Sequence, residues 1–178
     1  MINMVQNAKD QAAALAMAAY QAAVADGTLP QAEVKTAPVE IPKDTANGDF
    51  TTTFALAASK ALRQPPRNIA QALLDHMDLA GSYFASAEIA GPGFLNFRLN
   101  DSWYAAVCEA VEFFGNVCGL AHKDIVVSTV GDHRLFDRLP ALSVRPALAL
   151  SLHTTDNALR RKLLTNSKDI PVETLLER

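Results

Sequence analysis

The sequence predicts an α+β fold in which helices pack on a small, mainly antiparallel sheet, and three observations carry this prediction. Stretches rich in Ala, Leu and Gln place apolar residues at the three- and four-residue spacing of helices. Two segments, residues 83–90 and 94–99, alternate apolar and polar side chains, as half-buried strands do. A Gly-Pro-Gly turn separates these segments, so we expect a hairpin. Residues 1–114 are predicted to form this domain, and residues 115–178 an irregular, mostly helical tail of unknown fold.

The predicted elements of the domain follow in the order helix, strand, two helices, hairpin and helix. Residues 2–26 are dense in helix formers and end at Gly27, a frequent helix stop. An edge strand is expected within residues 34–41, because Pro38 has no backbone donor. Further helices are expected over residues 49–62, 67–76 and 102–114.

Helical periodicity also predicts which side chains of these helices face the core. The first helix is expected to bury a narrow stripe of Val5, Ala8, Ala12, Leu15, Ala19 and Ala22. The helix over 49–62, capped by Asn47 or Asp49, is expected to bury Phe50, Phe54, Ala57, Ala58 and Ala61. The helix over 102–114 is expected to bury Trp103, Val107, Ala110, Val111 and Phe114.

The tail carries weaker patterns. A short strand is expected over residues 125–130 and a turn of helix over 133–139, followed by a segment that Pro140 and Pro146 interrupt. Short helices are expected over 157–164, capped by residues 154–156, and over 172–178.

Composition places the chain among soluble globular proteins, with 49% hydrophobic and 20% charged residues among 178. No run approaches the roughly 20 apolar residues that cross a bilayer, and no signal peptide is recognisable. We therefore expect a cytoplasmic protein without a membrane partner, in which Cys108 and Cys118 are reduced thiols.

The net charge argues against a tight, freestanding nucleic-acid-binding protein, because such proteins are usually strongly basic. The chain has a formal charge of −3, and residues 1–111 carry seven basic against eleven acidic side chains. Any contact of this part with RNA is expected to be weak and to involve few points.

No catalytic constellation is recognisable, so we predict no catalytic residue and no metal ligand. Phosphate-loop, zinc-protease and nucleophile-elbow motifs are all missing from the sequence. His122, His133 and His153 stand at spacings that suit scattered surface residues better than a metal site, and the basic triplet at residues 160–162 suits a solvated helix face.

The strand over residues 94–99 carries the strongest candidate site. Its alternation turns Leu95, Phe97 and Leu99 to one side and Phe94, Asn96 and Arg98 to the other. The second row combines a ring, an amide and a guanidinium, which suits stacking on a base, hydrogen bonding to its edge and contact with a phosphate. The alternative is that Phe94 packs under its own turn and that the two polar side chains are merely solvated.

Three segments resemble the N-terminal additional domain of bacterial-type arginyl-tRNA synthetase. In order along the chain, they are Asn47-Gly48-Asp49-Phe50-Thr51, the Pro-Arg-Asn-Ile-Ala-Gln-Ala-Leu helix of residues 66–73, and Glu88-Ile89-Ala90-Gly91-Pro92-Gly93-Phe94-Leu95-Asn96-Phe97. The resemblance spans about residues 36–111, and the preceding helix fits the same domain.

The resemblance implies a contact with the D-loop of tRNA. By position, Phe94 would stack on a base and Asn96 would bind its edge. Gly91 and Gly93 would shape the turn, and Arg98 would meet a phosphate. Gly48 and Asp49 are expected to cap a helix beside the sheet. The alternative is a module that docks on a synthetase body without touching RNA.

The family's catalytic signatures do not occur in this sequence, so ATP and arginine are expected to bind a domain that this chain lacks. A separate synthetase body is a candidate partner. The tail does not resemble the family, which leaves three interpretations: a truncated product, a change of reading frame after about residue 113, or a freestanding paralogue with its own tail.

Overall fold

A computed structural model describes residues 3–129, 131–164 and 170–177 of the chain. The packing divides it into two compact units, Met1–Asn100 and Asp101–Arg178, which we call unit 1 and unit 2. This division concerns packing alone, and the domain boundary after residue 114 stays a prediction.

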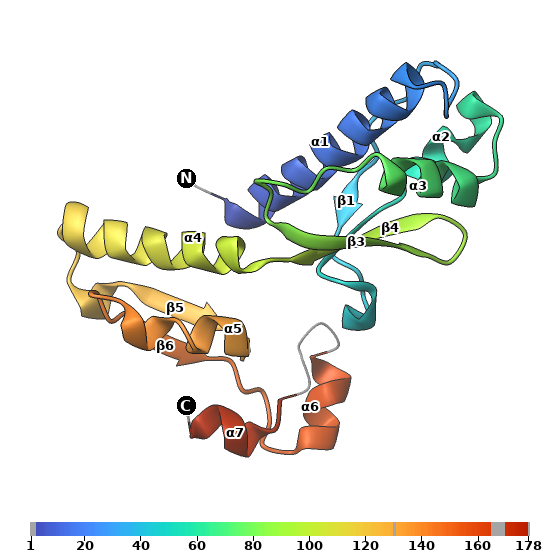
Figure 1. Cartoon of the computed structure of the whole chain (residues 1–178). Coiled ribbons are helices and arrows are strands. Elements are labelled where there is room, and N and C mark those ends of the chain that lie inside the picture. Colours follow the sequence, from blue (N-terminus) through green and yellow to red (C-terminus); the bar gives the residue numbers. More distant parts are fainter. Residues whose placement is uncertain (1–2, 130, 165–169, 178) are drawn as a thin grey trace. The chain divides into compact units, whose positions relative to one another are not determined.

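Unit 1 is a four-stranded sheet with three helices (Figure 1). The helices are α1 (Met4–Ala25), α2 (Phe54–Leu62) and α3 (Pro66–Asp75), and a 3₁₀ turn, η1, spans Thr45–Asn47. The strands are β1 (Val39–Glu40), β2 (Phe50–Thr52), β3 (Phe84–Ala90) and β4 (Phe94–Leu99). Their order is β1-β2-β4-β3, and each neighbouring pair is antiparallel. The predicted α+β class and the β3–β4 hairpin are thereby confirmed.

Helix α1 packs through small side chains, as its composition predicts. Asn3 caps the helix by accepting a hydrogen bond from the Gln6 N–H at 3.0 Å. The buried residues are Ala8, Ala12, Ala16, Ala19, Tyr20 and Ala23. The predicted stripe was therefore right in kind but wrong at Val5, Leu15 and Ala22, which are not buried.

The segment before α2 corrects the prediction of one helix over residues 49–62. Phe50–Thr52 forms strand β2, and α2 begins only at Phe54. Consecutive threonines favour an extended chain, and pairing with β4 fixes it there. Asp49 caps no helix; its Oδ2 accepts a hydrogen bond from the Leu99 N–H at 2.8 Å. A Cβ on Gly48 would stand 2.7 Å from the Phe97 oxygen, so glycine is needed for this close approach.

The core of unit 1 lies between the helices and one face of the sheet. Three rings from three strands meet there: Phe84 lies 5.0 Å from Phe97 and 6.1 Å from Phe50, measured between centroids. All three are at most 3% exposed. Each contributes a large apolar area, so this cluster is the main support of the sheet.

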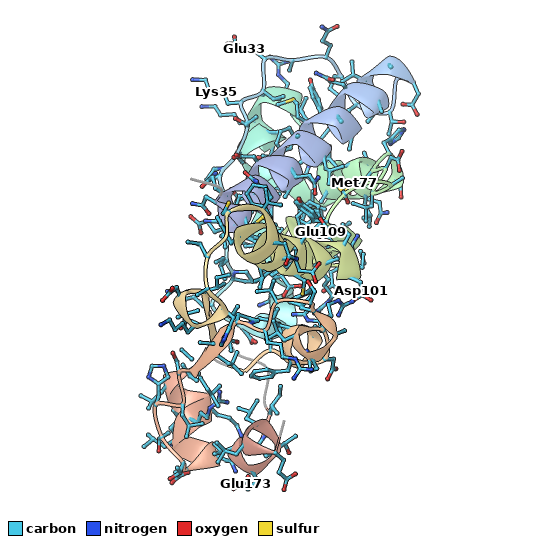
Figure 2. The ribbon with its side chains drawn as sticks, turned by 90° about the vertical axis from the view of Figure 1, so that its left-hand side faces the viewer. Glu33, Lys35, Met77, Asp101, Glu109 and Glu173 are labelled. Carbon is cyan, nitrogen blue, oxygen red and sulfur yellow. The ribbon has the colours of Figure 1, made fainter. Side chains whose placement is uncertain are left out.

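Unit 2 begins with α4 (Asp101–Glu112), which continues into a π-helical turn, η2 (Phe113–Val117). Its buried residues are Tyr104, Cys108 and Val111. The prediction was right at Val111 and wrong at Trp103, Val107 and Ala110, which are half-buried, and at Phe114, which is 42% exposed. Figure 2 labels Asp101 and Glu109, two exposed acidic residues of this helix.

The rest of unit 2 contains short elements. They are η3 (His122–Asp124), β5 (Val126–Thr129), α5 (His133–Phe136), η4 (Leu139–Ala141), β6 (Ala147–Leu150), α6 (Asn157–Leu163) and α7 (Val172–Leu176). Strands β5 and β6 pair in parallel. Asp156 caps α6 as expected, accepting from the N–H groups of Ala158 and Leu159. Strand β6 was not predicted from the sequence. The last residues of the predicted strand over 125–130 and of the predicted helix over 172–178 lie outside the described residues.

None of the helices in the described ranges is both long and apolar enough to span a membrane.

An ion pair joins the C-terminal ends of α1 and α3. His76, which follows α3, shares a 2.6 Å hydrogen bond with Asp26, which follows α1. This bond, together with a 2.7 Å contact to the Ala72 carbonyl, raises the pKa of His76 above 6.5. Hydrogen bonds from Thr28 and then from His76 lower the pKa of Asp26 to about 2. The pair stabilises unit 1 most when both groups are charged.

We predict that this stabilisation weakens as pH rises. A raised histidine pKa stabilises the fold below about pH 6.5 and loses its effect as pH passes the folded-state value. Urea unfolding should therefore show a larger difference in free energy between wild type and Asp26→Asn at pH 5.5 than at pH 8.5. His76→Gln should show the same trend, and equal differences at both pH values would refute the assignment.

Candidate nucleic-acid interface

The sheet of unit 1 carries a groove on the face opposite the helices. Its cavity measures about 290 Å³, and we call it the outer-face groove. It is lined by Pro42, Asn47, Thr51, Ala90, Gly91, Pro92, Phe94 and Asn96. Strands β2, β3 and β4 supply its floor, and the hairpin turn and the loop before β2 supply its walls.

The alternation of β4 places side chains on the two faces as predicted. Leu95 and Phe97 are fully buried in the core. Phe94 and Asn96 lie on the groove side, where Phe94 is half-buried and Asn96 is 2% exposed. A Cβ built on Gly91 would lie 3.8 Å from the Phe94 ring, so the ring rests against its own turn while it lines the groove. The position of Phe94 is thus compatible with both sequence-based expectations: a ring on the outer row of the strand and a ring packed under its own turn.

The floor of the groove holds two polar side chains that lack partners. Asn96 of β4 stands directly opposite Thr51 of β2 in the antiparallel register. The Oγ1 of Thr51 is buried without a hydrogen-bond partner among the described residues. Within the same part of the chain, the carboxamide of Asn96 makes no hydrogen bond either. Buried polar groups are normally paired, so the floor has unused donors and acceptors.

Two arginines hold the walls of the groove. Arg67, in the first turn of α3, donates from Nη1 to the Gly91 oxygen at 2.8 Å. Arg98 donates from Nη2 to the Ala46 oxygen at 2.7 Å and to Glu88 Oε1 at 3.0 Å. Arg67 therefore fixes the hairpin turn, and Arg98 fixes the loop before β2.

Gly93 brings the hairpin turn close to α3. Its φ is +138°, and a Cβ there would stand 2.9 Å from the carbonyl carbon and oxygen of Pro66. Gly91 also has a positive φ, +51°. Both glycines shape the turn that holds Phe94.

The structure brings together most of the predicted site residues. Phe94, Asn96 and Gly91 line the groove, and Gly93 lies buried behind the turn. Arg98 shares this face of the sheet but is engaged with Glu88, so its contact with a phosphate stays a prediction. Sequence reasoning missed Thr51 and Arg67. Thr51 is placed beside Asn96 only by the pairing of β2 with β4, whose residues here are 45 positions apart in the sequence. No local sequence pattern indicates that Arg67 contacts the hairpin turn.

Other candidate chemistry is sparse in the part of the chain that the structure describes. There, no three His, Cys, Asp or Glu residues gather as metal ligands would. Cys108 and Cys118 are both free, and burial raises the pKa of the Cys108 thiol. A buried thiol with a raised pKa is a poor nucleophile at neutral pH.

Comparison with known proteins gives two kinds of curated relative. The chain is 37% identical over 121 residues to an arginine–tRNA ligase of Acetivibrio thermocellus, covering 66% of this chain and 22% of that one. It is 55% identical over 71 residues to a probable RNA methyltransferase of Thiobacillus denitrificans, covering 40% of this chain and 20% of that one. The chain thus spans about a fifth of the length of these relatives.

Among solved structures, the arginyl-tRNA synthetase of Thermus thermophilus is similar with a TM-score of 0.39 and 27% identity, covering 65% of this chain and 17% of that one. The family model of the arginyl tRNA synthetase N terminal domain matches residues 9–99, which is half of the chain and nearly all of unit 1. This chain belongs to the arginyl-tRNA synthetase N-terminal domain family.

Proposed function

We propose that unit 1 binds tRNA by receiving one unpaired nucleotide of the D-loop in the outer-face groove. Phe94 stacks on the base, and Asn96 forms hydrogen bonds with its edge. One observation supports this most directly: Asn96 is 2% exposed as a residue, its carboxamide has no hydrogen-bond partner in the described residues, and it lies beside a half-buried ring.

The energetics of Asn96 favour a ligand. Asn96 is only 2% exposed as a residue, so water has little access to its unpaired carboxamide. A base edge presented in the groove would satisfy the carboxamide, and the stacked ring would add to the binding energy.

Because the chain has a net negative charge, the affinity would come from contacts with the base rather than from attraction to phosphates. Acidic residues outnumber basic ones, 19 to 16, and Arg98 near the groove is already paired with Glu88. Counterion release therefore contributes little. The module would act in translation, in the cytoplasm, together with a synthetase body that binds ATP and arginine, and we assign neither ligand to unit 1.

Replacement of Phe94 tests the stacking role. We predict that Phe94→Ala weakens tRNA binding by about 1–3 kcal/mol, the usual contribution of one stacked base. Phe94→Trp should retain binding, whereas Phe94→Leu should weaken it, because leucine keeps apolar volume but has no flat ring. Fluorescence anisotropy with labelled tRNA at low salt measures all three affinities.

Tyr83→Ala is the matched control, because this half-buried ring lies in unit 1, just before β3, and does not line the groove. It should bind tRNA like the wild type. Equal affinities for wild type and Phe94→Ala would exclude the stacking role. If the chain instead binds a separately supplied synthetase body and no tRNA, the docking module is the correct function.

A second candidate function concerns unit 2. The similarity to a probable RNA methyltransferase is 71 residues long, and residues 100–178, which lie outside the synthetase family model, are long enough to hold it. We therefore propose that unit 2 is related to RNA methyltransferases and supplies a second RNA contact.

The sheet of unit 2 fits a segment of a larger fold. Parallel sheets are usually covered on both faces, yet Val126 of β5 and Leu148 of β6 are 58% and 46% exposed. Among the described residues, this sheet has only two strands.

Hydrogen–deuterium exchange of the full chain with and without tRNA separates the two candidate functions. A contact through the groove alone should slow exchange at residues 90–97 and 47–51 and leave residues 101–178 unchanged. A second RNA contact should also slow exchange within unit 2. Unchanged exchange throughout unit 2 would refute that contact.

A further inference from the structure

Four polar side chains form a row across the outer face of the unit 1 sheet. In the antiparallel register, Glu40 pairs with Thr51, Thr51 with Asn96, and Asn96 with Glu88. The two glutamates at the ends of the row are exposed. Glu88 is paired with Arg98, whereas the two middle residues, Thr51 and Asn96, line the groove and make no side-chain hydrogen bond among the described residues.

Thr51 has no structural partner that explains its hydroxyl. Its Oγ1 is buried and unpartnered within the described ranges, while the next residue, Thr52, donates to the Pro38 oxygen. Valine would suit a strand position of this shape as well as threonine does. The hydroxyl is therefore a cost to folding that binding would offset.

The geometry points to Thr51 as a specificity-determining residue for the base held in the groove, an inference that rests on the proposed function. We propose that its hydroxyl and the Asn96 carboxamide bind adjacent positions on the edge of one nucleobase. Side chains directly opposite each other on antiparallel strands have Cβ atoms about 4.5–5.5 Å apart. Two side chains at this separation can form hydrogen bonds with two neighbouring atoms on the edge of one base. Paired hydrogen bonds of this kind distinguish one base from another.

The size of the groove suits a single base. A cavity of about 290 Å³ lies just below the usual range for small-molecule sites, roughly 300–1,000 Å³. The aromatic wall comes from Phe94, and the polar floor from Thr51 and Asn96. This combination fits a flat ring with a hydrogen-bonding edge.

The test measures base preference and affinity together. An abasic scan of the D-loop of a tRNA for arginine first identifies the nucleotide whose base matters most to binding by the full chain. Four tRNAs then carry each base in turn at that position. They are titrated with wild type, Thr51→Val, Thr51→Ser and Phe94→Ala, with Thr53→Val as control. Thr53 is half-buried beyond the end of β2 and makes no side-chain bond to α2.

Wild type should prefer one base by about three- to tenfold, the effect of one hydrogen bond. Thr51→Val should reduce this preference to less than about twofold, while Thr51→Ser and Thr53→Val should keep it. Thr51→Val should also melt at the same or a higher temperature, because it removes an unpartnered buried hydroxyl. Phe94→Ala should weaken binding of all four tRNAs by a similar factor.

An unchanged preference in Thr51→Val, with binding still weakened by Phe94→Ala, would overturn the role of Thr51 and leave the proposed function standing. If neither variant affects binding, both proposals are wrong. A large loss of thermal stability in Thr51→Val would also overturn the inference, because the hydroxyl would then be structural.

Discussion

The pairing of β2 with β4 is the constraint on which the rest of unit 1 depends. One register places Phe50 opposite Phe97 on the helix side and Thr51 opposite Asn96 on the other side. Because side chains alternate along a strand, a slip of β2 by one residue would turn Phe50 out of the core and Thr51 into it. The packing energy of the aromatic cluster therefore also fixes the polar floor of the groove.

The walls of the groove depend on contacts that do little for the core. Arg67 holds the hairpin turn through Gly91, and Arg98 holds the loop before β2 through Ala46. Gly48 lets that loop approach β4, where an added Cβ would meet the Phe97 oxygen at 2.7 Å. The sequence features that identify the family are thus the ones that shape a cavity around two unpartnered polar side chains.

The sequence predicted the local patterns well and the long-range pairings poorly. The hairpin, the two faces of β4 and helix α3 follow from alternation, turn residues and caps, all of which are local. Phe50 was assigned to a helix because its spacing from Phe54 is helical, yet pairing with β4 makes it a strand. Thr51 entered the site for the same reason, and β6 was missed because its pairing with β5 is parallel and also distant in sequence.

In the proposed complex the carboxamide of Asn96 receives an RNA base, and its side-chain NH₂ resonance reports this contact directly. In ¹⁵N-labelled full chain titrated with tRNA, this signal should shift in proportion to occupancy. The Asn100 carboxamide, which donates to the Ser82 oxygen at 2.8 Å, should stay in place as an internal reference. Saturable tRNA binding that leaves the Asn96 signal unmoved would contradict the account.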